Sequence, residues 1–309
     1  MPVFLKKNGV YRPTVLDTFI DKISITCDVP VAQQYEIIQG LKNEQKGPKY
    51  IYGISASLPL GTKFLESDGD KNTDTKLLVQ CSPPASHKDM KFMRVEWNPE
   101  RIAVDDVAAV LTMLSPGLYE QIMTKGTITR LDVAVDVANL AIDDYVFHRP
   151  GIRYTRIECQ SGKTMYLGSD ESECGTVIYD KQAELKDKNK KKPKALKNLP
   201  GKWAVTRVEQ RLRPKKPLAL AEVTALPNPF GSLVIAGYAG LSSADVMWSL
   251  FLDSVRFRTA PAALLRIKNK KLRAQYAKRL EKAAVTWWKP DKIWSRLPPR
   301  IDELLAPVG

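Results

Sequence analysis

Residues 127–137 alternate strictly between apolar and polar side chains, and this pattern constrains the fold more than any other stretch of the chain. In an extended strand, apolar side chains such as Val133 fall on one face, and Arg130, Asp132 and Asp136 fall on the other. An ordinary strand face in water does not need two aspartates in line with an arginine. The pattern therefore predicts a strand with a specialised polar face.

Three more strand patterns follow, at residues 163–168, 175–181 and 205–213. The polar stretch 169–173 separates the first two, which predicts a hairpin. In the last pattern the period of two places Arg207, Glu209, Arg211 and Arg213 on one face. If these strands are neighbours, one sheet surface collects side chains suited to phosphoryl chemistry: Asp132, Asp136, Tyr179, Lys181 and Glu209.

The first half of the chain predicts an antiparallel sheet with helices on one face, because strand and helix patterns alternate there. Strands are expected at residues 21–29, 50–57, 77–81 and 91–97, after an N-terminal arm, and helices at 31–41 and 104–114. After Pro214, a helix is expected at 244–255, capped by Ser242 or Ser243, and another at 262–285 behind Pro261. The fold class is therefore α+β, with two related halves sharing the sheet as an option, followed by a mostly helical C-terminal region. We expect a catalytic domain at 1–215 and a basic DNA-binding or dimerisation region at 216–309.

The formal charge of +14, from 48 Lys+Arg against 34 Asp+Glu, favours a polyanionic partner. Eight lysines and one acid occupy residues 186–202, and cations dominate the expected helix 262–285. Either a solvated surface or DNA contact explains the lysine run, whereas the helix favours nucleic acid. The candidate DNA-binding residues are Lys186, Lys188, Lys190, Lys191, Lys192, Arg266, Lys270, Lys271 and Arg273.

No run of eighteen apolar residues and no signal-peptide pattern is present, so we expect a cytoplasmic protein that does not bind membranes. The four cysteines are widely spaced without a CxxC motif, which indicates neither zinc nor a disulfide framework. Cys27 and Cys81 end apolar strand patterns and are expected to be buried, reduced thiols.

Six short motifs, in order, resemble the replication initiation factor family of rolling-circle plasmid and phage initiators, also called the Rep_trans family. They are DKIS at 21–24, RVEWNP at 94–99, RLDVAVD at 130–136, TMYLGS at 164–169, YDK at 179–181 with Glu184, and RVEQRLR at 207–213. The resemblance covers about residues 20–215. It implies an origin-specific nickase whose tyrosine attacks one DNA strand and later rejoins it. It also implies a divalent metal, a homodimer and a helicase partner.

The resemblance assigns the nucleophile to Tyr179, with Tyr166 as the main rival and Tyr154 as a third candidate. Lys181 and Arg207 complete the expected catalytic set, although each can equally serve as an ion-pair partner of a neighbouring carboxylate. Some family members carry a second tyrosine four residues after the first, where this chain has Ala183.

Mg²⁺ or Mn²⁺ is the expected cofactor, held by oxygen ligands. The better-known rolling-circle nickases bind their metal through a histidine–apolar–histidine pair, but here His87 and His148 lie far apart. The expected ligands are therefore the carboxylates of Asp132, Asp136, Glu209 and Glu96, which can instead form salt bridges with the arginines beside them.

Two other functions stay open from the sequence. One is an origin-binding protein that makes no cut, which would keep the fold and the charge. The other is a tyrosine recombinase, whose chemistry needs an Arg-His-Arg setting around the tyrosine that two isolated histidines do not provide. A membrane-surface protein is the weakest alternative, because only the charge supports it.

Overall fold

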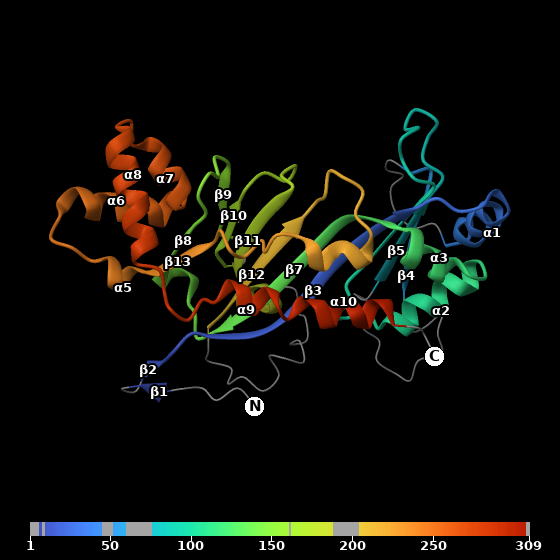
Figure 1. The fold of residues 1–309 in the computed structure, drawn as a ribbon, viewed down its shortest axis with the longest axis horizontal. Helices are drawn as coiled ribbons and strands as arrows, with labels where there is room; N and C mark the ends of the chain where they lie inside the picture. Colours follow the sequence, from blue (N-terminus) through green and yellow to red (C-terminus); the bar gives the residue numbers. More distant parts are fainter. Residues whose placement is uncertain are drawn as a thin grey trace. The chain divides into compact units, whose positions relative to one another are not determined.

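The computed structural model describes residues 6–7, 10–44, 52–59, 76–160, 162–187 and 204–306. Its central feature is a nine-stranded antiparallel sheet in the order β4-β5-β6-β3-β7-β12-β11-β10-β9 (Figure 1). The strands are β3 (Thr14–Cys27), β4 (Ile54–Pro59), β5 (Lys76–Cys81), β6 (Met93–Trp97), β7 (Thr127–Ala138), β9 (Thr155–Glu158), β10 (Thr164–Leu167), β11 (Cys174–Asp180) and β12 (Val205–Leu212). The chain is a mixed α+β protein, which confirms the predicted fold class.

Most strands lie where the alternation of side chains predicts them, but the first one does not. Strand β3 begins at Thr14, so part of the expected N-terminal arm is strand. Residues 14–20 are rich in β-branched and aromatic side chains, which favour an extended backbone. Thr18 Oγ1 donates a hydrogen bond to the carbonyl of Ile293 at 2.9 Å, and the carbonyl of Leu16 accepts one from Arg296. These contacts hold the early part of β3 against the C-terminal segment.

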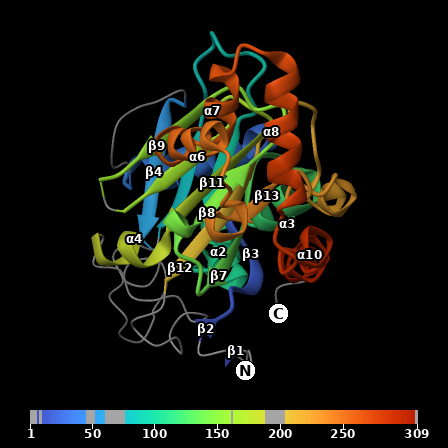
Figure 2. The same cartoon turned by 90° about the vertical axis from the view of Figure 1, so that its left-hand side faces the viewer.

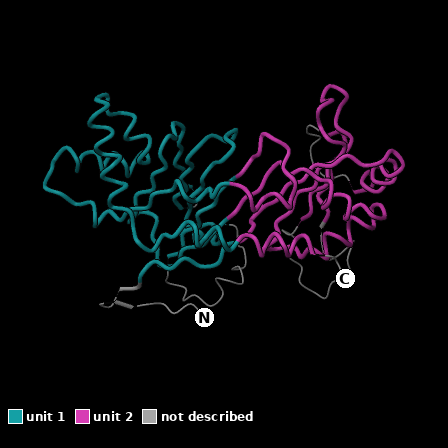
Figure 3. Tube along the Cα trace, viewed as in Figure 1, with its two compact units in different colours: residues 1–18, 134–211, 227–296 teal, residues 19–133, 212–226, 297–309 magenta. Residues whose placement is uncertain are grey.

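By packing, the chain forms two compact units, each assembled from three stretches of sequence (Figure 3). Unit 1 comprises residues 1–18, 134–211 and 227–296. Unit 2 comprises residues 19–133, 212–226 and 297–309. The expected division into a catalytic domain and a helical DNA-binding region concerns function and stays a prediction.

Unit 2 covers one face of its strands with helices. Apolar residues such as Ile25 and Val95 are fully buried on that face, where α1 (Val31–Lys42), α2 (Val104–Leu114) and α3 (Leu118–Lys125) pack. The opposite face is polar, because Ser24 lies across from Glu96 and accepts a hydrogen bond from Arg94 Nε at 2.7 Å. Helix α10 (Leu297–Leu305) packs on the short 3-10 helix η3 (Leu220–Ala225) in the same unit.

Unit 1 carries three helices that share a core of their own. Helices α6 (Val246–Arg258), α7 (Ala260–Arg266) and α8 (Lys270–Lys282) enclose Trp248, Tyr276 and Leu280. Helix α6 packs on β9, and α7 packs on β8 (Tyr145–His148), which pairs with β13 (Val234–Gly237) (Figure 2). No described helix is long and apolar enough to cross a membrane.

The expected helix 262–285 is wrong in one respect, because two helices occupy this region. Helix α7 ends at Arg266, and α8 begins at Lys270 behind Asn269, whose Oδ1 accepts a hydrogen bond from the N–H of Leu272 at 3.1 Å. An asparagine that caps a new helix ends the preceding one, and the apolar period alone does not reveal this. Pro261 does lie in the first turn of α7, as predicted.

The cap of α6 also differs from the expectation. Asp245, rather than Ser242 or Ser243, accepts the hydrogen bond from the N–H of Trp248, at 3.2 Å. The expected buried thiols are confirmed, because Cys27 and Cys81 are buried and form no disulfide.

We predict that truncating α8 inside the unit 1 core is costly, whereas truncating the exposed end of α7 is not. Leu280 is fully buried, so Leu280→Ala should lower the free energy of unfolding by about 2–5 kcal/mol. Leu265 is 46% exposed, and Leu265→Ala should change it by less than about 1 kcal/mol. Urea unfolding of both variants measures the difference. Equal losses would contradict the difference in burial between Leu280 and Leu265.

Candidate active site

The hairpin β10–β11 places Tyr179 on a defined face of the unit 1 sheet. Thr164 lies across from Tyr179, and Tyr166 lies across from Val177, which confirms the predicted hairpin. Residues that face each other across an antiparallel pair share a face, and so do residues two apart on one strand. Tyr179 and its rival Tyr166 therefore lie on the same face of the sheet.

Strand β12 adds charged side chains to this face. Thr176 on β11 donates a hydrogen bond to Gln210 Oε1 at 2.9 Å, so these two side chains share the face opposite Tyr179. By alternation, Arg207, Glu209 and Arg211 point to the side of Tyr179. Asp136, at the end of β7, joins them through an ion pair with Arg207. The structure thus brings together four of the predicted site residues: Asp136, Tyr179, Arg207 and Glu209.

Lys181 reaches this group by a route other than the predicted one. It is the first residue of α4 (Lys181–Asp187), so the strand period does not extend to it. Asp180 ends the strand, because its Oδ1 accepts hydrogen bonds from the backbone N–H groups two and three residues later, at 2.9 and 3.0 Å. Lys181 is nevertheless buried, with its Nζ 5.6 Å from the centroid of the Tyr179 ring.

The charged groups around Tyr179 form close ion pairs. Arg207 binds Asp136 through two parallel contacts, Nε to Oδ1 at 2.7 Å and Nη2 to Oδ2 at 2.9 Å. Both side chains are almost fully buried, so each charge depends on the other for its solvation. Arg211 Nε lies 2.6 Å from Glu209 Oε1. Lys181 Nζ lies 2.6 Å from Glu184 Oε2, and this i,i+3 spacing is the signal in the sequence that predicts the pairing.

The other two expected metal ligands, Asp132 and Glu96, belong to unit 2. Arg130 Nε donates to both carboxylate oxygens of Asp132, at 2.9 and 3.0 Å. Glu96 lies 3.0 Å from Lys22 Nζ. Burial by itself would raise the pKa of Glu96, but the cations of Lys22, Arg94 and Arg130 lower it below its usual value.

These ion pairs decide how well the expected carboxylates suit a divalent metal. Asp132, Asp136, Glu209 and Glu96 each hold a guanidinium or ammonium group, and within the described ranges no three histidine, cysteine or acidic side chains cluster as a metal site would require. In this arrangement the donor set does not fit a bound metal, because a metal would have to displace the cations.

Tyr166 differs from Tyr179 in its surroundings. Its hydroxyl donates to Glu158 Oε2 at 3.1 Å, and the guanidinium of Arg156 lies 4.2 Å from the centroid of its ring. Burial and the hydrogen bond to Glu158 raise the pKa of Tyr166, despite the opposing effect of Arg156 and Arg211. Tyr154, the third candidate, is 54% exposed and precedes β9.

The expected DNA-binding cations fall into two groups. Lys186 is exposed on α4, but Lys188, Lys190, Lys191 and Lys192 lie outside the described residues. Arg266, at the end of α7, and Lys270 and Lys271, at the start of α8, are exposed, whereas Arg273 is half-buried beside a cavity. Apart from Lys186, the exposed candidates that the structure describes lie at the junction of α7 and α8.

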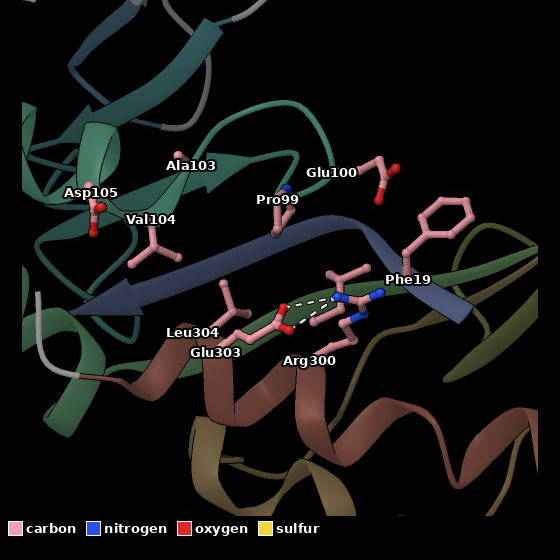
Figure 4. A pocket seen from close by; sticks show the side chains of 10 residues that line it. Phe19, Pro99, Glu100, Ala103, Val104, Asp105, Arg300, Glu303 and Leu304 are labelled. Atoms are coloured by element: carbon pink, nitrogen blue, oxygen red, sulfur yellow. Dashed lines mark hydrogen bonds and ion pairs between the residues drawn. The ribbon is translucent and has the colours of Figure 1, made fainter. Parts of the chain in front are cut away.

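Unit 2 also contains a hollow of about 310 Å³, between the start of α2 and helix α10 (Figure 4). Phe19 and Leu304 contribute apolar walls, and Glu100 and Asp105 contribute carboxylates. The dashed lines in Figure 4 mark the ion pair of Arg300 with Glu303, at 3.1 Å. None of the predicted site residues lines this hollow.

Comparison with known proteins adds a similarity to solved structures. No protein-family model matches the sequence, and no curated protein matches it. A solved structure of a rolling circle replication initiator protein from Geobacillus stearothermophilus is 17% identical, with 79% of this chain and 98% of that chain covered and a TM-score of 0.38. A likeness with so low a TM-score carries no argument about this chain.

Proposed function

We propose that this protein initiates rolling-circle DNA replication, by nicking one strand at an origin and rejoining it through a covalent bond to Tyr179. The observation that carries the proposal is the surface of unit 1 on which Tyr179 lies, beside Lys181 and on the same face as Arg207 and Glu209. The ordered sequence motifs and the net charge of +14 support a DNA substrate.

The chemistry transfers a phosphoryl group without loss of bond energy. Attack by Tyr179 Oη on a backbone phosphorus forms one P–O bond and breaks the bond to the 3′ oxygen of the preceding nucleotide. The tyrosine proton passes to a base, and the departing 3′ oxygen takes up a proton. Because one phosphodiester replaces another, attack by a 3′ hydroxyl reverses the step and rejoins the strand.

Tyr179 is a better candidate than Tyr166 for a physical reason. A tyrosine hydroxyl has a pKa near 10, so its attack requires a neighbour that favours the phenolate. The ammonium of Lys181 lies 5.6 Å from the centroid of the Tyr179 ring. Burial and, after it, the hydrogen bond to Glu158 raise the pKa of Tyr166, which disfavours the phenolate there.

Arg207 acts in this proposal as a positioning residue. Its guanidinium is held in two contacts by Asp136 on the face that carries Tyr179, and both side chains are almost fully buried. Glu184 pairs with Lys181, with Oε2 2.6 Å from Nζ. The carboxylates fix the cations in place, but they also neutralise part of the positive charge that a phosphate needs.

We propose that a divalent cation supplies the remaining charge; because the expected carboxylates already hold arginine or lysine side chains, the cation would have to displace those partners, and no step above is assigned to it. The pairing of Lys181 and Arg207 with carboxylates leaves less positive charge for a reacting phosphate. This favours the second candidate function, an origin-binding protein that makes no cut. Incubating supercoiled origin plasmid with the protein and Mn²⁺ separates the two functions, since only a nickase yields open circles.

The first prediction concerns the nucleophile. Tyr179→Phe removes one oxygen and little packing, so the variant should fold, bind origin DNA as the wild type does, and form no covalent DNA complex. Tyr166→Phe is the matched control on the same face and should keep nicking. Covalent complexes are measured by gel electrophoresis and mapped by mass spectrometry. If Tyr166→Phe abolishes cutting and Tyr179→Phe does not, the assignment is wrong.

The second prediction concerns the metal. EDTA should abolish nicking, and added Mg²⁺ or Mn²⁺ should restore it, because oxygen ligands bind these hard cations and phosphoryl transfer benefits from their charge. Zinc should not be required, since the chain lacks clustered histidines and cysteines in sequence. Undiminished nicking in EDTA would remove the divalent cation from the proposed function.

The third prediction concerns DNA affinity. Replacing Arg266, Lys270 and Lys271 with glutamine should weaken DNA binding and lower the slope of log K against log salt by roughly 0.9 per lost phosphate contact. The matched control replaces three exposed lysines of unit 2, Lys42, Lys88 and Lys125, with the same loss of charge. Fluorescence anisotropy at several salt concentrations measures both. Identical slopes in the two triple variants would show that the junction of α7 and α8 does not contact DNA.

A further inference from the structure

A cavity of about 230 Å³ lies in unit 1, between the loop that follows β8 and helices α7 and α8. Its walls are largely apolar, with Ile152 from the loop, Leu264 from α7 and Ala277 from α8. Gly151 turns the loop with a φ of 78°, a backbone conformation that glycine adopts without strain. The cavity is therefore built by three segments rather than by one surface groove.

His148 lines this cavity and is only 4% exposed. Neither of its ring nitrogens has a hydrogen-bond partner in the part of the chain that the structure describes. Burial lowers the pKa of His148 to about 4, so the ring is uncharged at neutral pH and offers one N–H donor and one acceptor. Leaving both unpaired in a buried site is unfavourable, which indicates that the cavity has an occupant with matching polar atoms.

Charged side chains also line the cavity, namely three arginines and the exposed carboxylate of Glu281. Arg149 is already committed, because it donates to the carbonyl of Cys174 at 3.0 Å, to Thr176 at 3.1 Å and to Ser232 at 3.0 Å. Arg153 is exposed and Arg273 is half-exposed, so their guanidinium groups can meet an anion at the surface. The cavity thus combines apolar walls, a buried uncharged hydrogen-bonding group and charged side chains with a net positive charge, since the arginines outnumber Glu281.

A single nucleotide has the complementary chemistry. A base presents flat apolar faces and an edge with both donors and acceptors, and its phosphate carries the negative charge. A free inorganic anion would leave the apolar walls and the uncharged imidazole unused. We propose that this cavity binds one unstacked base of single-stranded DNA, with His148 hydrogen-bonded to the base edge and Arg153 and Arg273 near its phosphate. The proposal rests on the proposed function, since nicking exposes single-stranded DNA.

The test compares two probes that carry the same phosphates, a 12-nucleotide thymidine oligonucleotide and an abasic 12-mer. Fluorescence anisotropy at one salt concentration gives the ratio of their dissociation constants, which isolates the contribution of the bases. For the full-length wild type we expect a ratio of about 10 or more, from the stacking and pairing of a base in the cavity. Ala277→Phe fills the cavity and should lower the ratio at least about threefold.

Ala274→Phe is the matched control, because Ala274 is exposed on the same helix and does not line the cavity. It should keep the wild-type ratio. His148→Leu removes both ring nitrogens and should also lower the ratio, which keeps the test valid if Ala277→Phe unfolds. A ratio near 1 in the wild type, or one unchanged in both cavity variants, overturns the proposal and leaves a water-filled cavity.

The readout is independent of nicking, so the two proposals can fail separately. A protein that nicks origin plasmid but shows no cavity-dependent ratio retains the proposed function and loses the base site. A protein with a cavity-dependent ratio that cuts nothing retains the base site and loses the nickase. Thymidine monophosphate serves as a competitor, and displacement of the oligonucleotide by micromolar concentrations of it would overturn the assignment in favour of a free nucleotide.

Discussion

The buried ion pair between Arg207 and Asp136 is the interaction on which the candidate site depends. Strand β12 is buried on both faces along nearly its whole length, yet it carries Arg207 and Glu209 in that setting. A charge removed from water is tolerated only with a well-placed partner, and the two-contact geometry with Asp136 provides one. The pairing therefore determines where Arg207 can lie on the face that carries Tyr179, and any substrate contact on this face has to be consistent with it.

The sequence predicted the strands of this site better than it predicted their pairing. The sequence pattern predicted the bounds of strand β7 and helix α2 to within a residue. Side chains repeat every two residues in a strand and every 3.6 in a helix, so both patterns are visible in the sequence itself. Alternation also put Arg207 and Glu209 on one face. Which carboxylate pairs with which cation depends on neighbouring strands, and this information is not local. In the described residues the expected carboxylates form no cluster of three, because Arg207 from a neighbouring strand binds Asp136 and Arg211 binds Glu209.

Two capping residues, Asp180 and Asn269, are visible in the sequence, but the prediction followed the periodicity of the side chains instead. Asp180 followed by a short polar helix is a capping pattern, and it moves Lys181 off the strand. Asn269 likewise divides the basic C-terminal segment into α7 and α8. In both cases one side-chain oxygen that accepts a backbone N–H ends one element and starts another. His148 could not be found from the sequence, because its burial and its unpaired nitrogens arise only from the packing of three separate segments around it.

The interleaving of the two units has a consequence for how the chain reaches its native state. Unit 2 uses residues 19–133, 212–226 and 297–309, and unit 1 uses the stretches before and between them. During synthesis, helix α10 leaves the ribosome after the whole of unit 1, so unit 2 stays incomplete until α10 has been made. Contacts between residues so far apart in sequence slow folding and leave strand edges exposed in the meantime. The strands of residues 19–133 therefore wait for residues 297–309 before unit 2 is complete. During this interval, chaperones can bind the incompletely folded chain.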